Sequence, residues 1–147
     1  MSSRRIRTMP QDKESGLRAS RFGKDCARRI AAAIGARMLG AKSNECFWKD
    51  EGAIIKCAHL KTSSVGVLYH MTGRIASVLG AFQEGDGTYR VIRLPIERCR
   101  AKMNALPTRS RGPSSGRVGL IPRKTFYDEG HLIAIVTIEE SSDPLLE

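Results

Sequence analysis

The chain has 147 residues, 41% of them hydrophobic and 27% charged, which suits one globular domain with a single buried core. Its 25 Lys and Arg residues exceed its 15 Asp and Glu residues by ten, and this excess favours a polyanionic partner, most often nucleic acid. The four cysteines include no CxxC pair, which argues against a zinc ribbon or a thioredoxin-type site, and no apolar run is long enough to cross a membrane. We therefore expect a cytoplasmic protein with reduced cysteines and no membrane partner.

The charged residues are unevenly distributed along the chain. Residues 1–24 carry seven Lys or Arg and two acids, and residues 98–124 carry eight Lys or Arg and no acid. Residues 128–147 carry six acids and no Lys or Arg. This acidic end either shields the basic surface or simply solvates the end of the chain.

The same composition predicts the domain organisation. Residues 1–17 are polar and basic without apolar periodicity, so we expect a flexible basic arm. Residues 18–138 are expected to form a single globular domain, and residues 139–147 an acidic tail. Within the domain, residues 107–117 consist only of Pro, Thr, Arg, Ser and Gly, which is typical of a basic loop that buries no core face.

The first expected element is a helix over residues 18–39. Apolar residues recur there at every fourth position, as on one face of a helix: Cys26, Ile30, Ile34 and Met38. Gly40 is a plausible helix stop.

Short strand-like runs follow this helix. Residues 45–48 and 53–60 are two apolar runs separated by a turn, and they predict a pair of strands. Residues 65–74 are ambiguous, and a short helix is favoured. Residues 75–82 are nearly all apolar, as expected for a strand buried on both faces.

The second half of the chain continues the pattern. The dipeptide Asp86-Gly87 is a hairpin signal that leads into a returning strand over residues 88–94. Pro95 opens an expected helix over residues 95–106, and the runs 118–121 and 131–138 are expected to be closing strands. This order of elements predicts a mixed α/β (α+β) fold with an N-terminal helix, a central mixed sheet of four to five strands, and flanking helices.

Lys56 lies inside an apolar strand-like run, where lysine is a poor choice unless its charge has a function. A metal-dependent phosphodiesterase needs carboxylates that hold a divalent cation, and it benefits from a nearby cationic side chain. Because side chains alternate along a strand, a lysine and an acid two residues apart share one face of a sheet. Lys56 is therefore either such a functional cation or an ordinary solvent-facing strand residue.

The order of elements resembles the PD-(D/E)xK nuclease superfamily, which has the restriction-endonuclease-like fold. Glu45 matches the acid of the first strand, Lys56 matches the lysine of the second, and RIASVLGAFQEGDGTYRVIRLPIERCRAKM matches the hairpin that leads into a helix. The resemblance covers residues 22–106. It implies a metal-dependent DNA endonuclease with Glu45 and Lys56 as catalytic residues, Mg²⁺ or Mn²⁺ held by Glu45 with Asp25 or Asp50, and a homodimer.

The sequence departs from this family at one position. Ile54 stands two residues before Lys56, where the family has Asp or Glu, and residues 58–83 contain no acid that could replace it. The site is therefore either built from other acids or has lost its metal. Each remaining acid also has a structural interpretation: Glu45 as an exposed strand-end residue, Asp50 and Glu51 as turn residues, and Asp25 as a helix acid paired with Arg28 or Arg29.

The basic segments predict contacts with nucleic acid. Arg109, Arg111 and Arg117 belong to a loop rich in Ser and Gly, in which guanidinium and backbone N–H groups can reach phosphates. The basic residues of the N-terminal arm could follow the backbone or enter a groove; they are Arg4, Arg5 and Arg7. A solvated loop and arm are the alternative, and no base-reading motif is present.

Three functions remain open on the sequence alone. The first is a nucleic-acid-binding protein, with DNA favoured over RNA, that hydrolyses phosphodiester bonds. The second is a binding or regulatory module on the same fold without catalysis. The third is a protein-interaction subunit that uses its basic arm and acidic tail.

Overall fold

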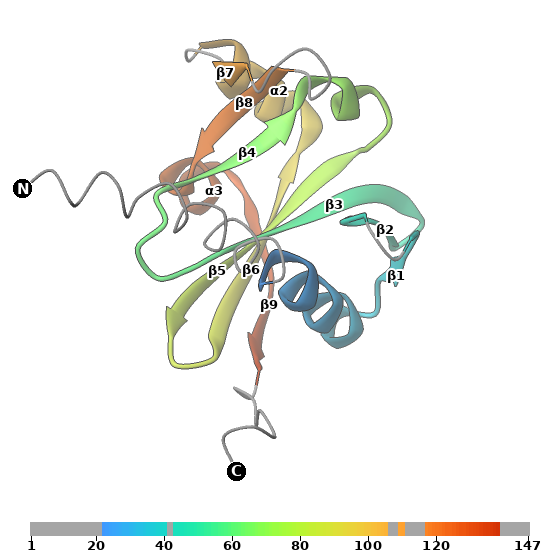
Figure 1. Cartoon of the computed structure of the whole chain (residues 1–147), viewed down its shortest axis with the longest axis vertical. Helices are drawn as coiled ribbons and strands as arrows, with labels where there is room; N and C mark the ends of the chain where they lie inside the picture. Colours follow the sequence, from blue (N-terminus) through green and yellow to red (C-terminus); the bar gives the residue numbers. More distant parts are fainter. Residues whose placement is uncertain (1–21, 41–42, 106–108, 111–116, 139–147) are drawn as a thin grey trace, which may run out of the picture.

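The computed structural model describes residues 22–40, 43–105, 109–110 and 117–138 (Figure 1). The predicted basic arm, the acidic tail and most of the predicted 107–117 loop lie outside these residues. The described chain has a mixed α+β fold with two sheets and three helices longer than a single turn.

The larger sheet is mixed, as predicted, and it contains six strands instead of four to five. Its strand order is β1 (Arg37–Met38), β2 (Glu45–Trp48), β3 (Glu51–Ala58), β5 (Ser77–Gly85), β6 (Thr88–Pro95) and β9 (His131–Thr137). Strands β3 and β5 are parallel, and every other neighbouring pair is antiparallel. The two parallel strands need a crossover, which the second sheet supplies.

The second sheet has three strands in the order β4 (Ser64–Leu68), β8 (Arg117–Pro122) and β7 (Arg109–Ser110). The chain leaves β3, passes through β4 and the 3₁₀ helix η1 (Tyr69–Gly73), and returns as β5. Helix α2 (Ile96–Ala105) follows β6, and helix α3 (Arg123–Glu129) lies between β8 and β9. Figure 1 shows the small sheet and α2 at the top of the view, with helix 22–34 and the β5–β6 turn toward the bottom.

The predicted helix over residues 18–39 ends earlier in the structure, where the described part of the chain is helical over 22–34; residues 18–21 lie outside the described residues. Gly35 adopts φ +78°, and the Ala36 N–H donates to the Ala31 carbonyl at 2.8 Å, as in a Schellman helix end. Met38 then belongs to strand β1. The apolar period alone did not reveal this stop, and Gly40 was the wrong glycine.

Gly35→Ala is expected to lower the free energy of unfolding by about 1 kcal/mol, because alanine resists a positive φ. The added methyl group would meet nothing within 4 Å, so the effect isolates backbone strain. Gly23→Ala is the matched control, since Gly23 is helical and equally open. That control should raise stability by up to about 1 kcal/mol. Urea unfolding of both variants measures the difference, and equal effects would contradict a left-handed helix end at Gly35.

The short helix favoured for residues 65–74 was wrong in its first half. Val65 and Val67 are buried while their neighbours are not, which is the period of a strand, and the segment pairs with β8 as strand β4. Only residues 69–73 are helical, as 3₁₀ helix. Helix α3 was not predicted; it has seven residues and covers one buried aromatic, Phe126.

Two further local predictions were wrong: residues 109–110 of the predicted loop form strand β7, and Glu51, predicted in a turn, begins strand β3. The predicted hairpin, second helix and closing strands are confirmed. The β5–β6 hairpin forms, with Gly87 at φ +69° in its turn, and α2 begins directly after Pro95. Both predicted closing strands form as well, although β8 joins the second sheet and β9 joins the first.

The hydrophobic core has two parts, one on each face of the larger sheet. Helix 22–34 covers one face, where Ile30 packs with Ile55 and Leu79. The second sheet, α2 and α3 cover the other face, where Ile54, Phe82 and Phe126 are buried. Because side chains alternate along β3, Lys56 lies on this second face together with Ile54.

Candidate nucleic-acid interface

Glu45 and Lys56 share one face of the larger sheet. Glu45 lies directly opposite Ile54 across the β2–β3 pair, and Lys56 follows Ile54 by two residues. Both side chains line a pocket of about 260 Å³. Its lining also includes Lys24 from helix 22–34, so we name it the Lys56 pocket.

The carboxylate of Glu45 is held by Arg74. The Arg74 Nη2 atom lies 2.5 Å from one Glu45 carboxylate oxygen, and its Nε atom lies 3.3 Å from the other. The Glu45 side chain is 14% exposed and that of Arg74 is 56% exposed, so the guanidinium covers the acid from the solvent side. A metal ion at Glu45 would have to displace this two-pronged contact, which is a strong kind of ion pair.

The pocket therefore has an excess of positive charge. Among the described residues that line it, Glu45 is the only acid and is paired with Arg74, while Lys24 and Lys56 contribute two cations. Ile54, two residues before Lys56 on the same face, is 4% exposed and belongs to the core. A phosphate group suits this lining better than a divalent cation does.

The other acids predicted to hold a metal, Asp25 and Asp50, do not line the Lys56 pocket with Glu45. Asp25 is on helix 22–34, its side chain is 65% exposed, and it lies 3.8 Å from Arg28, one helical turn away. Asp50 is in the β2–β3 turn with φ +66° and lines a different pocket. Among the described residues, no group of three His, Cys, Asp or Glu side chains could hold a metal ion.

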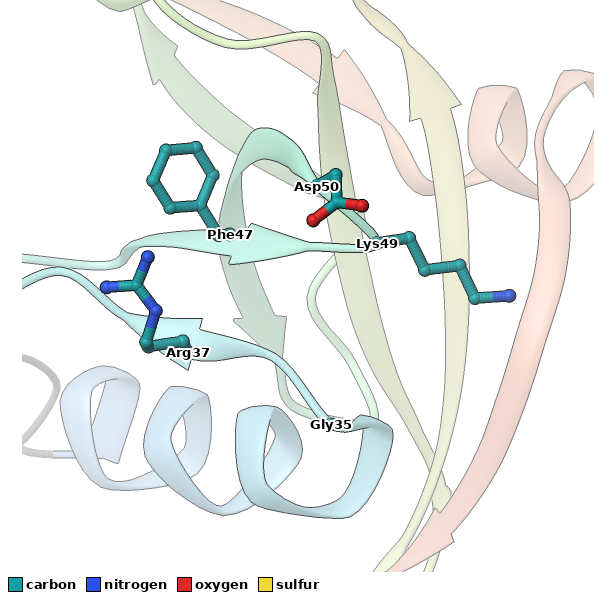
Figure 2. Close-up of a pocket in the computed structure, with 5 residues that line it drawn as sticks. All are labelled: Gly35, Arg37, Phe47, Lys49 and Asp50. Carbon is teal, nitrogen blue, oxygen red and sulfur yellow. The ribbon is translucent and has the colours of Figure 1, made fainter.

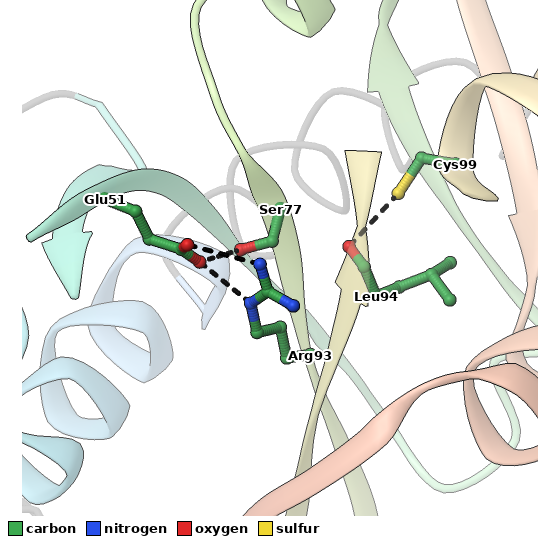
Figure 3. A network of polar contacts seen from close by, with 5 residues as sticks. All are labelled: Glu51, Ser77, Arg93, Leu94 and Cys99. Carbon is green, nitrogen blue, oxygen red and sulfur yellow. Dashed lines mark hydrogen bonds and ion pairs between the residues drawn. The ribbon is translucent and has the colours of Figure 1, made fainter. Parts of the chain in front are cut away.

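Glu51 is held by hydrogen bonds from residues of the neighbouring strands (Figure 3). The Arg93 Nε and Nη2 atoms donate to its two oxygens at 2.8 and 3.2 Å, and the Ser77 hydroxyl donates at 3.0 Å. These contacts join β3, β5 and β6. The hydrogen bond from Arg93 is the main reason that the pKa of Glu51 lies below its ordinary value.

Glu51→Gln is expected to reduce the acid sensitivity of the fold. Because the folded-state pKa is lowered, the contribution of Glu51 is present above its ordinary pKa of 4.5 and is lost as the pH falls through the folded value. Between about pH 6 and pH 3, the wild type should lose about 1 kcal/mol more stability than the variant. Denaturant unfolding at both pH values measures this loss. The exposed Glu97, changed to Gln, is the control and should leave the wild-type pH dependence intact; identical curves for Glu51→Gln would contradict the prediction.

Two buried thiols are poor nucleophiles. Burial raises the pKa of Cys46 to about 11 and that of Cys99 to about 12. The Cys99 thiol also donates to the Leu94 carbonyl at 3.6 Å (Figure 3). These cysteines therefore fill the core and offer no thiolate near neutral pH.

Of the arginines predicted to contact nucleic acid, Arg117 is the one whose side chain the structure describes. It is exposed, and its guanidinium lies 4.7 Å from the centre of the Tyr69 ring. Arg109 is placed by its backbone, which pairs with Val118 in the second sheet. The other predicted contact residues lie outside the described residues: Arg4, Arg5, Arg7 and Arg111.

Arg123 belongs to the same basic stretch of sequence but has a structural role. Its Nη1 atom donates to the carbonyls of His59, Leu60 and Thr62 at 3.1 to 3.3 Å. Its Nη2 atom donates to the Gln83 carbonyl at 2.6 Å. Arg123 thus fixes the connection between β3 and β4 and is not available to phosphates.

Sequence reasoning missed Lys24 and Arg74 as parts of the site. Lys24 was noted only as one of the basic residues in 1–24. Arg74 is separated from Glu45 by 29 residues along the chain. No local pattern marks such a long-range contact.

The geometry defines a mixed α+β protein with a cationic pocket on one face of its larger sheet. A scan against models of protein families and searches of curated proteins and of solved structures each found no match. None of the helices in the described part of the chain is long and apolar enough to span a membrane.

Proposed function

We propose that this protein binds nucleic acid, with DNA favoured over RNA. We also propose that the Lys56 pocket contacts a backbone phosphate without a metal ion. The observation that carries the proposal is the ion pair between Arg74 and Glu45, which occupies the acid and leaves the described lining of the pocket cationic. The excess of ten positive charges in the chain supports the same partner class.

The supporting chemistry is that of phosphate recognition. Lysine ammonium groups are compact charges that contact phosphates without strict geometry, and an arginine fork adds directed donors. Such contacts position a protein on the backbone without reading its sequence. We therefore expect binding that weakens steeply with salt and shows little sequence preference.

We also propose that the fold is a degenerate form of the restriction-endonuclease-like core. Helix 22–34 precedes the β2–β3 hairpin, and Glu45 and Lys56 share one face of that hairpin. Ile54 then marks a site that has lost its metal. The predicted homodimer and cytoplasmic location remain proposals, and light scattering in solution tests the first of them.

A metal-dependent endonuclease is the second candidate. The observation that favours it is that Glu45 and Lys56 line one pocket. In that version Glu45 holds Mg²⁺ or Mn²⁺ after Arg74 moves away, and Lys56 stabilises the charge that develops on the phosphate.

One pair of assays separates the two candidates. Labelled single-stranded and duplex DNA are incubated with the protein in EDTA to measure binding, and with Mg²⁺ or Mn²⁺ to measure cleavage. We expect binding in EDTA at about 0.1 M salt and no cleavage with either metal. Cleavage that disappears in the Lys56→Ala variant would favour the endonuclease, and the absence of binding in every condition would contradict both.

A further inference from the structure

A second pocket adjoins the end of helix 22–34 (Figure 2). Its volume is about 420 Å³, and it is lined by Gly35, Arg37, Phe47, Lys49 and Asp50. We name it the Phe47 pocket. Its lining includes an aromatic ring beside the Arg37 cation, while the Lys49 ammonium lies 4.9 Å from the centre of the Trp48 ring. A ring beside a cation suits a ligand with both a flat ring and a negative charge.

The Phe47 ring is exposed for a local reason. Its neighbours Cys46 and Trp48 are buried against helix 22–34, so alternation along β2 places Phe47 on the opposite face. Its cross-strand partner on β3 is Gly52, which has no side chain to cover the ring. Phe47 therefore remains 39% exposed.

Arg37 flanks this ring. It is the cross-strand partner of Phe47 on β1, and its guanidinium carbon lies 5.2 Å from the ring centre. Figure 2 shows Arg37 directed toward Phe47 and the Lys49 ammonium directed away from both. Arg37 is exposed, so the pair presents a cation beside an open aromatic surface.

Strand β2 contributes to both pockets, with Phe47 lining the Phe47 pocket and Glu45 lining the Lys56 pocket. Phe47 and Glu45 are two residues apart on β2, so their side chains leave the same face about 7 Å apart. Arg37 is paired with Phe47 across β1 and β2, Arg74 binds Glu45 farther along β2, and Lys56 follows on β3. Positive groups therefore extend from the ring to the proposed phosphate contact.

We propose that Phe47 stacks against an unpaired base of a single-stranded nucleic acid whose backbone continues into the Lys56 pocket. This inference rests on the proposed function and names its substrate class. Base stacking on an aromatic ring needs an exposed base face, which a duplex interior does not offer. Arg37 adds a cation for the phosphate beside that base, and the protein should therefore bind single strands more tightly than duplexes of the same length.

The test compares Phe47→Leu, Phe47→Trp and the wild type for binding to a labelled single-stranded oligonucleotide and to its duplex in EDTA. Phe47→Leu keeps an apolar side chain and should lower single-strand affinity about 10-fold while changing duplex affinity little. Phe47→Trp should preserve single-strand affinity, and its added indole fluorescence should be quenched when the strand binds. Leu132→Ala removes another exposed apolar side chain, 50% exposed against 39% for Phe47, from strand β9 at the far edge of the sheet, and should change neither affinity.

Equal loss of both affinities in Phe47→Leu, or no loss, would overturn the stacking role while leaving nucleic-acid binding intact. A wild type that binds neither strand form would overturn the proposed function and the inference together. Thermal unfolding of each variant establishes that it is folded before binding is compared.

Discussion

Changing Lys24 and Lys56 together to glutamine is expected to lower the affinity for DNA about 60-fold at ~0.1 M salt. Each phosphate contact releases close to one counterion, and at this salt concentration each release contributes a factor of about 8. Glutamine keeps much of the apolar stem of lysine, so the packing around the pocket should change little. Fluorescence anisotropy with a labelled duplex oligonucleotide in EDTA measures the loss.

The matched control changes Arg98 and Lys124 to glutamine. This pair removes the same number of charges, but the two residues form ion pairs with Glu129 and Asp128 and do not line the Lys56 pocket. If the control weakens binding as much as the pocket variant does, only net charge matters and the pocket is not the contact site. A large loss in the pocket variant alone supports the site.

The second large effect concerns Arg123. Arg123→Ala is expected to lower the free energy of unfolding by about 3 kcal/mol, because it removes the hydrogen bonds of Arg123 to the partly buried carbonyls of Thr62 and Gln83 and to the exposed carbonyls before Thr62. It also removes a guanidinium that lies 5.1 Å from the centre of the buried Phe82 ring. Urea denaturation measures the change.

Two further variants sharpen this result. Arg123→Lys keeps the charge but lacks the planar fork, so it should recover only part of the lost stability. Arg98→Ala, in an exposed ion pair, should change stability by less than about 0.5 kcal/mol. Equal stabilities of Arg123→Ala and Arg98→Ala would contradict the role of Arg123 in fixing the β3–β4 connection.

Locally encoded elements were predictable from the sequence. The Asp86-Gly87 turn and Pro95 are short-range signals, and both the hairpin and α2 follow from them. Strand β4 was misassigned because its strand character depends on β8, which lies far along the chain. The pattern of a short apolar segment fits a helix and a strand equally well until its pairing partner is known.

The candidate site was likewise predictable only in the part that depends on local sequence patterns. Alternation along β3 and the short β2–β3 turn placed Glu45, Ile54 and Lys56 on one face, as the sequence predicted. The ion pair of Glu45 with Arg74, which changes the chemistry of the pocket, comes from a segment that no local pattern connects to β2. Likewise, sequence reasoning assigned Arg123 no role beyond its place among the basic residues of 98–124, since only the structure shows its contacts with backbone carbonyls.

The salt dependence of DNA binding in EDTA tests the central claim most directly. For the wild type, the logarithm of the association constant should fall linearly with the logarithm of the salt concentration. In the variant with glutamine at positions 24 and 56, the slope should be smaller by about two, one for each lost phosphate contact. An unchanged slope and affinity in that variant, or binding that requires Mg²⁺, would contradict metal-independent phosphate contact at the Lys56 pocket.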